Sequence, residues 1–286
     1  MLGYKPQSSD TNPEIDRFLM QAFRRMPTWK KAHLTNEATK GIQQWAIIGI
    51  RNQNPNATPE EIWFQLAVRC LSKELVNRVD KINRQKKIMD AESIRLVLRV
   101  AEILETLAVD YLIGGSVASS ILGEPRATLD IDIVVNLQLF HVWLLVEAMK
   151  GEFYIDENMV TEAINCCSSF NVIHLDTMIK VDIFILSQEP LAQLEMQRRQ
   201  ELIITQNPER SAWFASAEDI ILQKLIWYRM GNQVSDRQWR DVLGVLKVQA
   251  QKLDFNYLEY WGGRLNLVDL VAQALQEAGL SENFEV

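Results

Sequence analysis

The strongest constraint in this sequence is a predicted β-strand that carries two acids on one face. Residues 128–136 (TLDIDIVVN) are rich in isoleucine and valine and are bounded by polar turns, which is typical of a strand. Because side chains alternate along a strand, Asp130 and Asp132 point to one face while the aliphatic side chains between them point to the other. Two like charges side by side destabilise a sheet unless a positive group neutralises them. A divalent cation such as Mg²⁺, which prefers oxygen ligands, is one such group.

A second predicted strand supplies a third acid. In residues 180–186 (KVDIFIL), Asp182 faces away from its neighbours Val181 and Ile183. If this strand lies beside the first, we expect Asp182 to reach the same cations. Three carboxylates and two divalent ions suit in-line phosphoryl transfer, in which one ion activates the attacking oxygen and the other holds the triphosphate.

A glycine-rich bend provides a site for phosphate. A short strand is expected at residues 111–113, followed by Gly114-Gly115-Ser116 and a short helix that ends near Leu122. Such a bend brings bare backbone N–H groups and a helix N-terminus to one point, which attracts phosphate. Ser116 adds a hydroxyl donor.

These motifs, in this order, resemble a known superfamily. Ile113-Gly114-Gly115-Ser116, thirteen residues, and then Asp130-Ile-Asp132-Ile133 is similar to the signature of the DNA polymerase β-like nucleotidyltransferases. Lys180-Val-Asp182-Ile looks like the third-acid strand of that superfamily. The resemblance covers residues 91–206 and, more loosely, residues 216–246.

The resemblance implies two-metal transfer of a nucleoside monophosphate from a nucleoside triphosphate (NTP), with Mg²⁺ or Mn²⁺ as the metal and pyrophosphate leaving. By this resemblance Asp130 and Asp132 bind both metals, Asp182 helps to position the metal of the nucleophile, and Gly115 and Ser116 hold the β- and γ-phosphates. The catalytic and metal-binding residues would be Asp130, Asp132 and Asp182, and the nucleotide-binding residues would be Gly114, Gly115, Ser116, Arg126, Thr128 and Lys224.

The segment before the first acidic strand contributes further candidates. Arg126 and Thr128 lie four and two residues before Asp130, so in an extended strand their side chains are expected on the same face as that of Asp130. Arg126 either contacts a phosphate or pairs with the acids. The alternative is an exposed arginine in a loop.

Two helix-capping signatures, at Ser216 and Ser235, predict helices near the C-terminus. The first helix (DIILQKLIWYRM) is apolar almost all round and is therefore expected to be buried, with Lys224 inside an apolar arc. A buried ammonium needs a partner, which would be Asp241 or a nucleotide phosphate. These segments resemble the C-terminal helices of AbiEii-type minimal nucleotidyltransferases, in which a lysine and an acid complete the site; a structural ion pair is the alternative.

Other side chains are expected to be structural. Trp227 and Trp239 fall on helix faces that we predict to be buried, and Cys166 and Cys167 are interpreted as small buried hydrophobes.

The expected fold class is α+β, with a small mixed sheet and helices in a nucleotidyltransferase core that is flanked by helical regions. The predicted divisions are a helical N-terminal module at 1–88, the core at 90–206 and a C-terminal helical region at 207–286, with a boundary in the basic stretch 78–90. The N-terminal module resembles a small helical domain of bacterial proteins of unassigned function. We interpret it as a packing or oligomerisation module.

Composition excludes several classes of site. The three cysteines have no C-x-x-C spacing and the three histidines are scattered, so no Cys/His metal site is expected and a metal must be held by carboxylates. No apolar run approaches the roughly 18 residues of a membrane span, and the N-terminus lacks a signal pattern. The expectation is a cytoplasmic protein without a membrane partner.

Charge is unevenly distributed along the chain. Residues 1–90 contain 15 Lys and Arg against 9 Asp and Glu, whereas residues 91–286 contain 15 against 28. The acidic remainder argues against a broad nucleic-acid surface there, and the basic first third docks on it or meets an acidic partner.

The sequence therefore predicts a nucleotidyltransferase with an unidentified hydroxyl acceptor, which could be a protein, a tRNA 3′ end or a small molecule. Resemblance to abortive-infection toxins suggests a toxin–antitoxin component with an antitoxin-like partner. The alternative is a catalytically inactive interaction protein that keeps the nucleotidyltransferase fold.

Overall fold

A mixed β-sheet lies at the centre of the computed structural model, which describes residues 13–70, 92–126, 128, 130–206 and 208–280. Within these residues the sheet has seven strands in the order β3-β4-β5-β2-β1-β7-β6. β2 pairs with β5, and β1 with β7, in parallel, and the other pairings are antiparallel. The strands are β1 (Tyr111–Ile113), β2 (Asp130–Val135), β3 (Phe153–Tyr154), β4 (Ser169–His174), β5 (Lys180–Ile185), β6 (Gln200–Gln206) and β7 (Glu209–Phe214).

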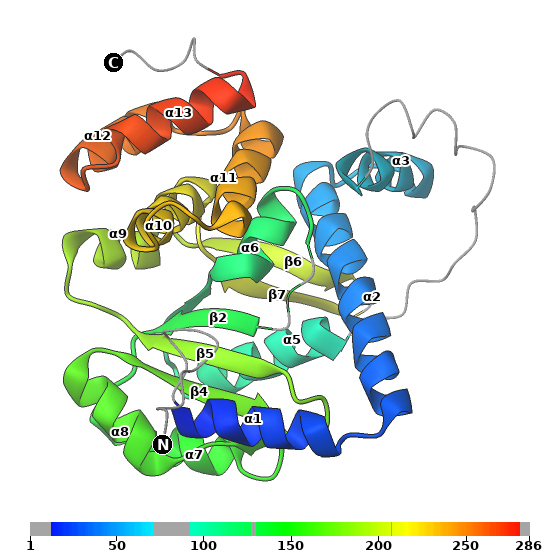
Figure 1. Ribbon diagram of the computed structural model, residues 1–286, viewed down its shortest axis with the longest axis vertical. Coiled ribbons are helices and arrows are strands. Elements are labelled where there is room, and N and C mark those ends of the chain that lie inside the picture. Colours follow the sequence, from blue (N-terminus) through cyan, green and yellow to red (C-terminus); the bar gives the residue numbers. More distant parts are fainter. Residues whose placement is uncertain (1–12, 71–91, 127, 129, 207, 281–286) are drawn as a thin grey trace.

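Helices cover the sheet, so the expected α+β class is confirmed. Figure 1 shows α10 to α13 at one end of the molecule and α1, α7 and α8 at the other, with the sheet between them. The helices are α1 (Pro13–Arg25), α2 (Thr28–Gln53), α3 (Pro59–Cys70), α5 (Glu92–Thr106), α6 (Gly115–Leu122), η1 (Leu139–His141), α7 (Val142–Met149), α8 (Glu157–Cys166), α9 (Pro190–Arg198), α10 (Ala217–Met230), α11 (Asp236–Gln249), α12 (Phe255–Arg264) and α13 (Val268–Ala278). In the described part of the chain, no helix combines the length and the apolar character that crossing a membrane requires.

Local sequence signals explain where several elements begin. Gly114 and Gly115 follow β1 directly and start α6, as the glycine-rich bend predicts. Ser216 caps α10 by accepting a hydrogen bond from the Asp219 N–H at 3.2 Å, and Ser235 caps α11 in the same way. Both predicted capping signatures are confirmed.

The structure corrects the expectation that the chain returns to helices after Gln206. β7 follows there instead, forms a hairpin with β6 and pairs in parallel with β1. Its polar start at Glu209 and Arg210 hides the alternation, because only Ala212 and Phe214 are buried. The sequence analysis also does not predict the elements β3, α8, α9 and β6.

Two further expectations concern the adjacent cysteines and the domain boundary. Cys166 and Cys167 are exposed rather than buried, because they lie at the end of α8, where Cys167 forms the left-handed C-cap. The predicted boundary at 78–90 lies outside the described residues.

Helix α2 is fixed on the core by one close backbone contact. Trp45 and Ile48 of α2 join the main apolar core. A Cβ atom on Gly49 would lie 1.8 Å from the backbone oxygen of Ile121 in α6, so only glycine allows this approach. Helix α2 is therefore packed tightly against α6, the helix that follows the glycine-rich bend.

We predict that Gly49→Ala lowers the free energy of unfolding by about 1–3 kcal/mol, because the backbones of α2 and α6 must separate. The matched control is Gly263→Ala in α12, where an added Cβ meets nothing within 4 Å. Thermal unfolding should show a clear loss for the first variant and no loss for the second. Equal melting temperatures would contradict the packing described here.

Candidate active site

The three acids singled out in the sequence lie on neighbouring strands and on one face. β2 and β5 pair in parallel with Asp132 opposite Asp182 and Asp130 opposite Lys180. The expected proximity of the two acidic strands is therefore confirmed. The environments of the acids differ, because the Asp130 side chain is 58% exposed at the start of β2 whereas Asp182 is buried in the middle of the sheet.

Asp182 is held by two buried polar neighbours. Lys180 Nζ lies 2.8 Å from Asp182 Oδ2 and 3.9 Å from Asp130 Oδ1. Asn171, which lies opposite Asp182 on β4, donates its side-chain amide to Asp182 Oδ1. The sequence analysis assigns no role to either neighbour. Lys180 is two residues before Asp182 in the same strand, so the alternation of side chains alone places it on the face of Asp182.

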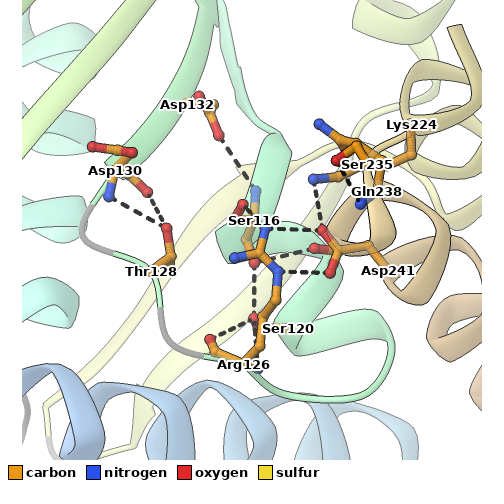
Figure 2. Close-up of polar contacts among 11 residues, drawn as sticks. Ser116, Ser120, Arg126, Thr128, Asp130, Asp132, Lys224, Ser235, Gln238 and Asp241 are labelled. Carbon is orange, nitrogen blue, oxygen red and sulfur yellow. Dashed lines mark hydrogen bonds and ion pairs between the residues drawn. The ribbon is translucent and has the colours of Figure 1, made fainter. Parts of the chain in front are cut away.

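The glycine-rich bend touches the second acid. The Ser116 N–H donates a hydrogen bond to Asp132 Oδ2 at 3.3 Å (Figure 2). Gly115 has a φ of +54°, and a Cβ atom there would lie 1.7 Å from the same oxygen. The bend can therefore approach Asp132 only because position 115 has no side chain.

A buried charge network joins the bend to the C-terminal helices. The Arg126 guanidinium donates to Asp241 Oδ1 at 2.7 Å and to Asp241 Oδ2 at 3.0 Å, and it also donates to the Ser116 hydroxyl (Figure 2). Lys224 Nζ lies 2.8 Å from Asp241 Oδ2. Arg126 therefore pairs with Asp241 on α11, a partner that the sequence analysis did not expect for it. Lys224 is buried beside its expected partner Asp241.

The network sets the protonation of Asp241. Burial alone would raise the pKa of this carboxyl group. The hydrogen bonds from Arg126 and the charge of Lys224 outweigh burial and hold the pKa of Asp241 below its ordinary value.

Thr128 has a different role, because its hydroxyl donates to the Asp130 carbonyl oxygen at 3.0 Å and so fixes the start of β2.

The three acids, the glycine-rich bend and the cationic side chains of Arg126, Lys180 and Lys224 line one central cavity of about 1080 Å³, whereas Asp241 and Asn171 lie behind its wall. Its wall also includes Phe23 and Leu34 from the N-terminal helices and Trp227 from α10. The expectation that Trp227 is buried is wrong: it is 41% exposed and meets Phe184 edge-on at the cavity. A helix that is apolar almost all round gives no sequence signal for the side that faces a cavity.

One further titratable group borders the cavity. Burial and the charge of Asp219 raise the pKa of Glu195 to about 8, although Gln223 opposes this by donating to Glu195 Oε1 at 2.7 Å. Glu195 is therefore mostly protonated at neutral pH.

The donor chemistry at the edge of β2 fits a divalent cation. Asp130 and Asp132 both border the cavity, and carboxylate oxygens are ligands that Mg²⁺ and Mn²⁺ take. Within the residues that the structure describes, however, no three His, Cys, Asp or Glu side chains are gathered closely enough to hold a metal. Asp130 and Asp132 would hold the ion, whereas Asp182 is already engaged by Lys180.

Comparisons with known proteins show distant structural likeness. No protein-family model and no curated protein matches the sequence. Among solved structures, the chain is similar to an antigenic nucleotidyltransferase-like protein from Paracoccidioides brasiliensis, with 19% identity and a TM-score of 0.43 over 66% of this chain and 93% of that chain.

We predict that Asp241→Asn lowers the free energy of unfolding by about 3 kcal/mol, because it leaves two cationic side chains without their carboxylate. The control is Asp236→Asn, the same change at an exposed position of the same helix, with an expected loss below about 1 kcal/mol. Urea denaturation checks both values at pH 7.

The comparison of wild type with Asp241→Asn also gives a pH test. Because the pKa of folded Asp241 is depressed, its contribution is complete above the ordinary value of 3.8 and is lost as the pH falls through the folded value. The stability difference between wild type and Asp241→Asn should therefore shrink in acid. A difference that stays constant to the acid limit of folding would contradict this account.

Glu195→Gln should show the opposite pH dependence. Between pH 4.5 and about 8 the unfolded chain releases a proton that folded Glu195 retains, so wild-type stability falls as the pH rises through this range. The melting temperature of Glu195→Gln, measured relative to that of wild type, should rise progressively from pH 5 to about pH 8. Between pH 8 and 9 the difference should stay constant. Glu189→Gln, at an exposed position, should show a flat difference.

Proposed function

We propose that this protein is a metal-dependent nucleotidyltransferase that moves a nucleoside monophosphate from an NTP to a hydroxyl acceptor. One observation carries the proposal: the register of β2 and β5 sets Asp132 opposite Asp182, and the glycine-rich bend contacts Asp132 within the same cavity. Carboxylates for a cation and backbone donors for phosphate therefore converge on one point.

The side chains divide the work as follows. Asp130 and Asp132 would hold the divalent cation, which neutralises charge on the triphosphate and on the leaving pyrophosphate when it is bound. Gly115 and Ser116 present backbone to the phosphates. Lys224 and Arg126 border the cavity and offer positive charge to the triphosphate, while Asp241 keeps both in place.

The transfer forms a bond between the acceptor oxygen and the α-phosphorus and breaks the bond from the α-phosphorus to pyrophosphate. The acceptor hydroxyl loses its proton to water. The cavity, at about 1080 Å³, is slightly larger than the roughly 300–1,000 Å³ of small-molecule sites, which supports room for an NTP and part of an acceptor together. A protein hydroxyl, a tRNA end and a small molecule all present the required group.

We predict that Asp132→Asn weakens the binding of Mn²⁺ with a non-hydrolysable NTP analogue at least about tenfold, because a metal ligand loses its charge. Asparagine has the same shape as aspartate and still accepts the hydrogen bond from Ser116. Isothermal titration calorimetry measures the affinity. Asp176→Asn, on the exposed turn between β4 and β5, is the control and should bind like wild type.

Two outcomes would count against the proposal. Equal binding by wild type and Asp132→Asn would remove Asp132 from the metal site. Failure of the wild type to bind the analogue would favour the inactive interaction protein instead. If binding is found, incubation with labelled NTPs and cell extract identifies the acceptor by the label it receives.

A further inference from the structure

Lys180 lies where the carboxylates of β2 and β5 come together. It is opposite Asp130 in the β2–β5 register and two residues before Asp182, so all three side chains emerge on one face. Its ammonium group is 2.8 Å from Asp182 Oδ2 and 3.9 Å from Asp130 Oδ1. The side chain is only 8% exposed, which means that the ammonium does not extend freely into solvent.

Two features keep the ammonium in this place. A buried lysine requires a partner of opposite charge, and Asp182 is such a partner. Asp182 is itself fixed, because Asn171 from β4 donates to its other oxygen. If the Lys180 ammonium moved away from Asp182, each of the two buried charges would lose its partner, which is strongly unfavourable.

Charge also argues against a second dication at this point. Without a bound nucleotide, the three carboxylates carry three negative charges, and one ammonium with one divalent ion balances them. A second divalent ion bound to Asp182 would lie within a few ångströms of the Lys180 ammonium and would be repelled by it.

We propose that Lys180 takes the place of one of the two divalent cations, so that the site binds a single divalent ion through Asp130 and Asp132. The inference rests on the proposed function and deepens it. The attacking hydroxyl then meets the Lys180–Asp182 ion pair where a two-metal site would offer a second ion.

The test is the number of Mn²⁺ ions bound by the full-length protein in the presence of a saturating non-hydrolysable NTP analogue. Electron paramagnetic resonance of free Mn²⁺ gives this number without any turnover. Wild type should bind one ion per chain. Lys180→Gln should bind two, because Asp182 becomes available, and Lys180→Arg, which keeps the charge, should bind one.

A second variant checks where the additional ion binds. Lys180→Gln combined with Asp182→Asn should return to one ion, because the released carboxylate is gone. Wild type with two ions, or Lys180→Gln with the wild-type number, would overturn the inference while leaving the proposed function intact. The wild-type number decides the matter even if the Lys180 variants do not fold. Wild type that binds neither analogue nor Mn²⁺ would instead refute the proposed function itself.

Discussion

The parallel pairing of β2 with β5 is the interaction on which the candidate site depends. Side chains alternate along each strand, so this register decides at once that Asp130, Asp132, Lys180 and Asp182 share a face. A slip of one residue would turn Lys180 and Asp182 into the apolar side of the sheet. The buried aliphatic residues between them, such as Ile131, Val181 and Ile183, prevent that slip, because it would expose them. The hydrophobic core thus fixes the arrangement of the charges.

The second level of organisation joins this face to elements far away in the sequence. Arg126 contacts both Ser116 at the glycine-rich bend and Asp241 on α11, and Asp241 also holds Lys224 on α10. The bend, the loop before β2 and two C-terminal helices therefore form one connected polar network. Its members are largely buried, so each depends on the others for its charge compensation.

Sequence reasoning predicted those parts of the site that follow from local pattern. The period-two alternation identified both acidic strands, and the paired glycines identified the bend, because these signals need only neighbouring residues. The position of Lys180 between two acids depends on strand register, and that of Asn171 depends on which strand lies next to β5. Neither property is local.

The other errors have a similar origin. α10 is apolar almost all round, so nothing in its sequence indicates that Trp227 borders a cavity. β7 begins with charged residues that hide its alternation, so the sequence predicts helix there. Cys166 and Cys167 are small and apolar in character, but their place at a helix end decides their exposure.

The N-terminal helices were interpreted from sequence as a packing or oligomerisation module, yet they take part in the cavity wall. Phe23 of α1 and Lys31 and Leu34 of α2 face the same space as the acids, and Gly49 secures α2 to α6. A molecule bound in the cavity would therefore lie near surfaces that the N-terminal segment supplies. The shape of this cavity is consequently open to change by mutations in α1 and α2, at positions outside the sheet that carries the acids.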